Sequence, residues 1–338
     1  MRVLLRTAGG RARNREIGLG HVYRCINLAS KLKSHDLYFL IEDYGGVEKI
    51  LIKHGYHNII FFKKDIDVES DIKKTLSFVN EKKIDFLIVD KYGIKINYIR
   101  KVKKIVRTIL ITDLRNIDFP ADLIINGFIG FKNTIKKNKY GTKCLLGPKY
   151  QILNDCFAKK KHVRKKYDLL ATFGGLDDHQ VIEGFLEVLS KYSDKIRTKL
   201  ILGPVTIKSK KIRQLEAKSH TNLKIIQQTN NMQKEMSQTK FGICSGGITS
   251  YEFAALNIPF AIISQVEHQL LTASEWKHCG VALDLGLIDY KTQYKINRFL
   301  MQIVENNVSI MKPRNRIVDG LGSHRAAVEI LKMNYKKC

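Results

Sequence analysis

The chain has 338 residues, of which 44% are hydrophobic and 27% charged, so it suits two packed domains and is not a wholly disordered protein. Lys and Arg number 59 against 32 Asp and Glu, and the formal net charge of +27 favours anionic partners such as nucleotides, nucleic acid or an acidic membrane. The first apolar run ends at Arg6, too early for a signal peptide, and no run approaches the roughly 20 residues that span a bilayer. The six cysteines form no CxxC pair, so we expect reduced thiols in a cytoplasmic protein without a metal site.

The first half of the chain alternates short apolar runs with helical patterns. A strand is predicted over Val3–Thr7 and a helix over Gly20–Leu32. Further strands are predicted at residues 37–41, 58–62, 85–90, 108–113 and 123–126. Apolar runs without alternation are typical of strands covered on both faces, which favours a parallel sheet in a doubly wound α/β domain.

The same series starts again after a basic linker at 159–166. Strands are predicted at residues 168–173, 199–202, 223–227, 241–244, 260–264 and 282–285, and helices at 178–189, 250–256, 269–277 and 323–333. We therefore predict a domain over 1–158, a second over 159–315, and a C-terminal segment, 316–338, that packs back on the first. Two such domains would hold a ligand in the cleft between them, beyond the carboxyl ends of their strands.

A glycine motif opens the first predicted helix. Gly18 and Gly20 allow close backbone approach, and the helix N-terminus offers free N–H groups to an anion. His21 follows at the helix start, but Tyr23 stands where a dinucleotide fingerprint has its third glycine. A relaxed turn with a capping histidine is the alternative.

A second turn follows the predicted strand 241–244. Ser245, Thr249 and Ser250 supply hydroxyl groups beside Gly246 and Gly247 at a helix start, and this composition suits a phosphate or diphosphate. Glu252, one turn further on, can accept two hydrogen bonds from a ribose diol. The alternative is that Glu252 only caps the helix.

Three further strand ends carry polar residues. Gly174 and Gly175 would allow the backbone to approach a ligand, whereas a turn with Asp177 or Asp178 capping the next helix is the alternative. Asp90 precedes Tyr92, which either reaches a ligand or covers the sheet, and Asp113 has the pattern of a cap. His268 and Gln269 open another helix, where they would contact a sugar or phosphate or act as caps.

Several catalytic motifs are absent from the sequence. It contains no GxxxxGK[ST], HExxH or GxSxG pattern, which argues against P-loop, zincin and α/β-hydrolase chemistry. No carboxylate cluster suggests a metal, so a diphosphate leaving group would be neutralised by helix N-termini, hydroxyls and basic side chains. We therefore expect no cofactor.

Together these segments resemble the PseG/SpsG family, whose members include a UDP-sugar hydrolase of the pseudaminic acid pathway and spore-coat polysaccharide proteins. The resemblance spans nearly the whole chain and rests on the ordered set Gly18-x-Gly20-His21-x-x-Arg24, Asp90-x-Tyr92-Gly93, Phe173-Gly174-Gly175-x-Asp177, Ser245-Gly246-Gly247-x-Thr249-x-x-Glu252, His268-Gln269 and Asp319-Gly320-x-Gly322. His268 stands where the family has Asn, and the segment 7–15 is longer than usual.

The resemblance implies a GT-B fold similar to that of MurG, with the second domain holding UDP. It implies hydrolysis of a UDP-2,4-diacetamido-2,4,6-trideoxy sugar to UDP and free sugar, with inversion, for nonulosonic acid or surface polysaccharide synthesis. It makes His21 and Tyr92 catalytic and assigns the ribose to Glu252. Substrate binding is then expected of Gly18, Gly20, Arg24, Gly174, Gly175, Ser245, Gly246, Gly247, Thr249, Glu252, His268 and Gln269.

The main alternative is a GT-B glycosyltransferase that passes the sugar to a sugar or lipid-linked acceptor. The positive charge would then favour weak association with an anionic membrane. A nucleic-acid-binding protein also fits the charge, but the lysines are scattered and no basic motif is interleaved with aromatics. We therefore expect a monomer that takes a UDP-sugar and does not bind nucleic acid.

Overall fold

The chain divides into two compact units. The computed structural model describes residues 1–10, 18–159, 163–174, 179–203, 206–218, 222–308, 310 and 316–335. Unit 1 comprises Met1–Asp155 together with Gly320–Cys338, and unit 2 comprises Cys156–Asp319. The last helix therefore belongs to unit 1, although it follows unit 2 along the chain.

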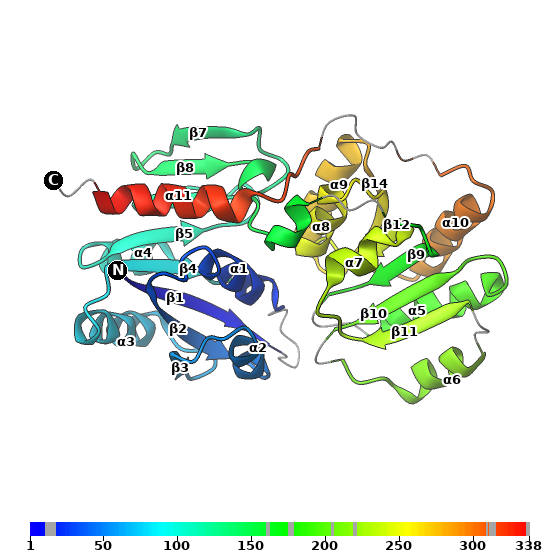
Figure 1. Cartoon of the computed structure of the whole chain (residues 1–338), viewed down its shortest axis with the longest axis horizontal. Helices are drawn as coiled ribbons and strands as arrows, with labels where there is room; N and C mark the ends of the chain where they lie inside the picture. The colour runs from blue at the N-terminus through cyan, green and yellow to red at the C-terminus, as the bar shows by residue number, and fades with distance from the viewer. Residues whose placement is uncertain are drawn as a thin grey trace. The chain divides into compact units, whose positions relative to one another are not determined.

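Unit 1 is built on one sheet that has eight strands within the described ranges, in the order β3-β2-β1-β4-β5-β6-β8-β7 (Figure 1). The pairs are parallel except that β7 runs antiparallel to β8. The strands are β1 (Arg2–Gly9), β2 (Asp36–Asp43), β3 (Ile59–Phe62), β4 (Phe86–Asp90), β5 (Arg107–Ile111), β6 (Leu123–Asn126), β7 (Thr134–Lys137) and β8 (Lys143–Leu146).

Helices cover both faces of this sheet. Val3 and Leu5 of β1 pack in one apolar cluster with α1, α2 and α11, whereas Leu4 packs in another with α3 and α4. Alternate residues of a strand point to opposite faces, so a continuous apolar run serves both layers. The helices are α1 (Gly20–Ala29), α2 (Val47–Lys53), α3 (Val68–Glu81), α4 (Ile96–Lys103) and α11 (Gly322–Tyr335).

The C-terminal helix α11, red in Figure 1, packs on unit 1 beside α1. A Cβ atom added at Gly322 would lie 2.0 Å from the carbonyl oxygen of Gln151, so only glycine permits this approach. Ser323 donates a hydrogen bond to the carbonyl of Leu153, and Arg107 donates to the carbonyl of Met333. Both ends of the helix are thus fixed to unit 1.

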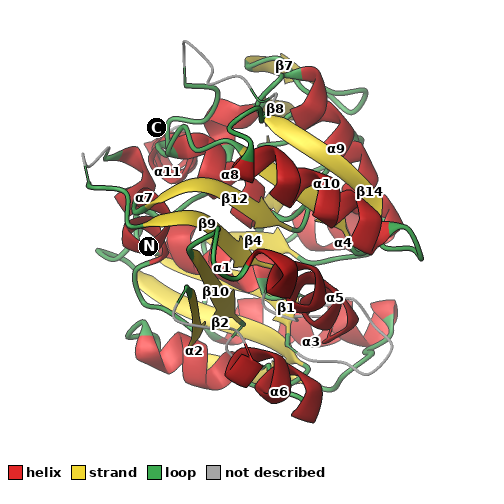
Figure 2. Ribbon diagram, turned by 90° about the vertical axis from the view of Figure 1, so that its right-hand side faces the viewer, coloured by secondary structure: helices red, strands yellow, loops and turns green. Residues whose placement is uncertain are grey.

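Unit 2 repeats the plan with a six-stranded sheet, counted over its described residues, in the order β11-β10-β9-β12-β13-β14. Figure 2 shows helices flanking these strands. The strands are β9 (Tyr167–Thr172), β10 (Thr198–Leu202), β11 (Leu223–Gln227), β12 (Thr239–Cys244), β13 (Phe260–Ser264) and β14 (Ala282–Leu287). The helices are α5 (His179–Leu189), α6 (Lys210–Lys218), α7 (Met232–Ser237), α8 (Ile248–Ala255), α9 (Glu267–His278) and α10 (Thr292–Val304), with short 3-10 turns at Pro148–Tyr150, Asp155–Ala158 and Ser190–Tyr192.

The predicted series of parallel strands and helices matches the observed elements, but the hairpin of β7 and β8 was not predicted. Every residue of β7 is exposed, so this strand shows neither a buried run nor an alternating pattern. Within the described part of the chain, no helix is both long and apolar enough to cross a membrane.

Candidate functional site

In both sheets the strand order reverses at the first strand of the unit. β1 lies between β2 and β4, and β9 lies between β10 and β12. Open parallel sheets bind ligands beyond the carboxyl ends of the strands at such a switch point. His21 and Arg24 lie on α1, just after β1, and the glycine turn at 245–247 directly follows β12. The sequence motifs thus lie at the two switch points.

In unit 1, His21 is paired with Asp90, the last residue of β4. The imidazole Nδ1 lies 2.6 Å from Asp90 Oδ1, and the Asp90 carboxylate is fully buried. Arg24 Nη2 also lies 2.8 Å from this Nδ1. Asp90 Oδ1 is the closer of the two and an ionised carboxylate can only accept, so we place the proton on Nδ1, which leaves Nε2 as a proton acceptor in the neutral ring. His21 does not cap α1, because the N-cap residue of this helix is Leu19 and no side-chain hydrogen bond caps it.

Arg24, one turn further along α1, binds the Asp90 carboxylate of this pair. Its Nε donates to Asp90 Oδ2 at 2.8 Å and its Nη2 to Asp90 Oδ1 at 2.6 Å. Nη1 and Nη2 also donate to the carboxylate of Asp113, which follows β5. Burial alone would lower the pKa of Arg24, but Asp113 and Asp90 raise it well above its usual value. The resemblance assigns Arg24 to substrate binding, whereas its donors face these two carboxylates.

Asp90 and Asp113 were both singled out in the sequence, but neither was assigned a partner. Two carboxylates and one guanidinium lie beside the imidazole, with a formal net charge of −1. Only the parallel pairing of β1 with β4 brings residues 21 and 90 together. A strand-end aspartate has the same local pattern whether it caps a helix or orients a histidine.

Tyr92 lies in the turn between β4 and α4. Its side chain is 65% exposed, so it does not cover the end of the sheet, which was the alternative to a ligand contact. The turn also contains Gly93, with a positive φ of 69°. Tyr92 is therefore presented to solvent two residues after the aspartate that binds His21.

In unit 2, the predicted Ser245 and also Gln265, which was not predicted, bind the carbonyl oxygen of Phe173. Ser245 Oγ donates to this oxygen at 3.0 Å, and Gln265 Nε2 donates to it at 2.7 Å. A Cβ atom at Gly174 would lie 3.6 Å from Ser245 Oγ. The ends of β9, β12 and β13 are thus held together by hydrogen bonds. Gly175, Asp177 and Asp178 lie outside the described residues.

Gly246 and Gln269 are also neighbours. A Cβ atom at Gly246 would lie 2.8 Å from Gln269 Cβ, so the turn after β12 requires glycine to pack against α9. Gln269 Oε1 accepts a hydrogen bond from the backbone N–H of Gln265 at 2.9 Å, which leaves its Nε2 as the donor of that side chain. His268 is exposed in the first turn of α9.

Gly247 is the N-cap residue of α8, and no side-chain hydrogen bond caps this helix. Thr249 is half-buried in its first turn. Ser250 cannot act as predicted, because its Oγ donates to the carbonyl of Gly247 and accepts from Trp276 Nε1. Glu252 lies beyond the first turn, so it is not a capping carboxylate. Burial raises the pKa of Glu252 to about 7.

No group of three or more His, Cys, Asp or Glu side chains is arranged to hold a metal ion in the ranges that the structure describes.

Gly18 and Gly20 flank the start of α1, and a Cβ atom at Gly20 would meet no atom within 4 Å. The two switch points therefore offer an oriented imidazole in unit 1 and a helix N-terminus with glycines in unit 2.

The solved structures that resemble this chain have the GT-B fold. MurG from Acinetobacter baumannii aligns with a TM-score of 0.63 at 15% identity, over 98% of this chain and 100% of that one. A UDP co-structure of MnaA from S. aureus aligns with a TM-score of 0.60 at 14% identity, over 100% and 98%. At such low identity these likenesses define the fold, which is GT-B with two Rossmann-like units.

Sequence comparison identifies the family. The spore coat polysaccharide biosynthesis protein SpsG of Bacillus subtilis is 30% identical over 322 residues, covering 91% of this chain and 92% of that protein. The UDP-2,4-diacetamido-2,4,6-trideoxy-beta-L-altropyranose hydrolase of Campylobacter jejuni is 24% identical over 308 residues, or 87% and 100%. No protein-family model matches the chain. The chain belongs to the PseG/SpsG family.

Proposed function

We propose that the protein is an enzyme acting on a UDP-sugar, and that it hydrolyses a UDP-2,4-diacetamido-2,4,6-trideoxy sugar to UDP and the free sugar. The observation that carries this proposal is the contact of 2.6 Å between His21 Nδ1 and Asp90 Oδ1 at the carboxyl end of β4. The activity for which the Campylobacter jejuni relative is named supports it. The product would serve nonulosonic acid or surface polysaccharide synthesis.

In this proposal His21 is the general base. Asp90 holds the Nδ1–H and stabilises the imidazolium that forms, so Nε2 is free to take a proton from water. Arg24 and Asp113 are positioning residues, because they act on the Asp90 carboxylate. Tyr92, exposed beside the same strand end, would donate a hydrogen bond to the sugar or diphosphate.

Unit 2 would hold the UDP. The uncapped N–H groups of α8, the hydroxyl of Thr249 and Gln269 Nε2 are donors suited to the diphosphate. Gly174, Ser245, Gly246 and Gly247 would line the same turn and allow close approach. Glu252 would accept the two ribose hydroxyls, and His268 would replace the family asparagine near the nucleotide.

The reaction would proceed by single displacement. A water oxygen bonds to the anomeric carbon while the bond from that carbon to the UDP oxygen breaks, and the bonding pair leaves with UDP. The water proton passes to His21 Nε2 and then to solvent. Attack opposite the leaving group inverts the anomeric carbon, and the donors of α8 stabilise the departing charge.

The test is hydrolysis of a panel of UDP-sugars in H₂¹⁸O without an acceptor, followed by mass spectrometry and NMR. We expect one equivalent of UDP per free sugar, ¹⁸O on the anomeric hydroxyl only, and an inverted first-formed anomer. Label in UDP would mean attack on phosphorus and would contradict the role of His21. Release of UDP only after a sugar or lipid acceptor is added would favour the glycosyltransferase.

A further inference from the structure

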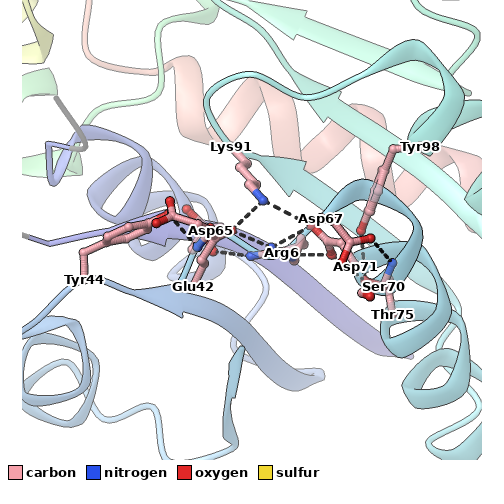
Figure 3. Close-up of polar contacts among 11 residues, drawn as sticks. Arg6, Glu42, Tyr44, Asp65, Asp67, Ser70, Asp71, Thr75, Lys91 and Tyr98 are labelled. Carbon is pink, nitrogen blue, oxygen red and sulfur yellow. Dashed lines mark hydrogen bonds and ion pairs between the residues drawn. The ribbon is translucent and has the colours of Figure 1, made fainter. Parts of the chain in front are cut away.

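A second buried charge group lies behind the His21–Asp90 pair, on the opposite face of the same sheet. This ionic cluster consists of Arg6, Glu42, Asp71 and Lys91 (Figure 3). Arg6 of β1 is fully buried and donates to both oxygens of Asp71, at 3.0 and 2.8 Å. It also donates to Glu42 Oε2 at 3.0 Å.

Lys91 joins the cluster from the turn after β4. Its Nζ lies 2.5 Å from Glu42 Oε2 and 3.1 Å from Asp71 Oδ2. The remaining oxygens are also used, since Tyr44 donates to Glu42 Oε1 and Thr75 to Asp71 Oδ1. Two cations balance two carboxylates and each carboxylate oxygen has a donor, so the cluster is a closed ionic group rather than a ligand site.

The cluster and the histidine pair share one stretch of backbone. Asp90 and Lys91 are consecutive, and their side chains leave β4 toward opposite faces, as expected at the end of a strand. Arg6 and the next residue of β1 pair with Val89 and Asp90 of β4. The position of the Asp90 carboxylate is therefore set by backbone that Lys91 anchors.

Stability alone does not account for this arrangement. Burying ions costs several kcal/mol each, and apolar replacement of a whole buried ion group is often neutral or stabilising. Burial alone would raise the pKa of Glu42, but hydrogen bonds from Lys91, Tyr44 and Arg6 hold it below its usual value. Such a fully bonded charged group instead fixes geometry.

We propose that Lys91 is a positioning residue for His21: its ion pairs with Glu42 and Asp71 fix the end of β4 so that Asp90 holds the imidazole in one orientation. The effect on turnover rests on the proposed function. The effect on the imidazole does not, because it is a property of the resting protein.

The test is the double variant Glu42→Gln with Lys91→Met, which removes one charge of each sign and leaves the Arg6–Asp71 pair. We expect kcat for UDP release to fall about tenfold to hundredfold while KM changes less than about twofold, because a small misplacement slows chemistry more than binding. The single variant Lys91→Arg should keep kcat within about threefold of wild type, since a guanidinium can bind both carboxylates. Tyr44→Phe is the matched control, because it removes a hydrogen bond to Glu42 without touching β4.

A second readout needs no substrate. In the wild-type protein, the Nδ1 proton of His21 should give a slowly exchanging downfield NMR signal that Asp90→Asn abolishes. The double variant should lose or broaden this signal, whereas Tyr44→Phe should keep it. A folded double variant with an unchanged signal and an unchanged kcat would overturn the proposal. If the wild type releases no UDP from any UDP-sugar, the signal alone decides it.

Discussion

The switch points of units 1 and 2 have the same strand order but different chemistry. At the end of β1 and β4, side chains are charged and paired, with His21, Arg24 and Asp90 in contact. At the end of β9 and β12, the turn is built from Gly246, Gly247 and backbone donors. The comparison teaches that one topology can present an oriented imidazole in one unit and a glycine turn at a helix N-terminus in the other.

The largest expected effect comes from the switch point of unit 1. His21→Ala should lower UDP release by about 10³-fold, because a positioned base contributes roughly 10²–10⁴-fold. Steady-state assay of UDP measures the change. The control is His57→Ala, which removes an exposed histidine between α2 and β3 and should leave the rate unchanged. Turnover within tenfold of wild type would remove His21 from the mechanism.

The next effect separates the base from its orientation. Asp90→Asn should lower kcat about 10²-fold, since an amide can donate to Nδ1 and favour the unproductive tautomer. Thermal melting shows whether the protein stays folded. Asp85→Asn is the matched control, because Asp85 precedes the same strand and accepts a hydrogen bond from the backbone N–H of Arg2. Equal losses in the two variants would mean that the effect is structural.

A smaller effect tests the switch point of unit 2. Only the ionised carboxylate of Glu252 would accept hydrogen bonds from both ribose hydroxyls. Because the pKa of Glu252 is raised to about 7, UDP should bind about tenfold more weakly at pH 6 than at pH 8. Calorimetry measures this ratio. The UDP phosphate also titrates near pH 6, so the same measurement is made on Glu252→Gln. In this variant the contribution of Glu252 to the pH dependence of UDP affinity is absent. Identical pH profiles would exclude this role.

Stability should respond to the same group with a defined sign. A carboxyl whose pKa is raised on folding holds its proton more tightly in the folded state, so stability falls as pH rises from about 4.5 to about 7. Glu252→Gln should therefore stabilise the protein by about 3 kcal/mol at pH 8 and have little effect at pH 4.5. Urea unfolding at the two pH values measures the difference. An equal change at both would mean that the charge is not the cause.

The smallest effect refines the charged side. Asp113→Asn should lower kcat only about threefold, because Arg24 keeps its two hydrogen bonds to Asp90 and Asp113 is half exposed. High salt should reduce the difference from wild type further. A loss as large as that of Asp90→Asn would mean that Asp113 acts on the substrate directly.

Much of the fold could be predicted from sequence, because uninterrupted apolar runs such as residues 123–125 are typical of strands covered on both faces. The edge strand β7 could not, since Thr134–Lys137 buries nothing. For the site, the glycines and His21 were recognisable, but the partners of His21 were not. Residues 21 and 90 are brought together by strand pairing, which also brings positions 6, 42 and 91 of the ionic cluster together, while Asp71 comes from α3.

The central claim is a division of labour, with UDP binding in unit 2 and the base in unit 1. The most direct test is UDP titration calorimetry at pH 8 on His21→Ala and Glu252→Gln, alongside kcat at saturating substrate. We predict that His21→Ala keeps the wild-type Kd for UDP within about twofold and loses turnover, whereas Glu252→Gln weakens UDP about tenfold and keeps most of kcat. Loss of UDP affinity in His21→Ala together with unchanged affinity in Glu252→Gln would contradict this account.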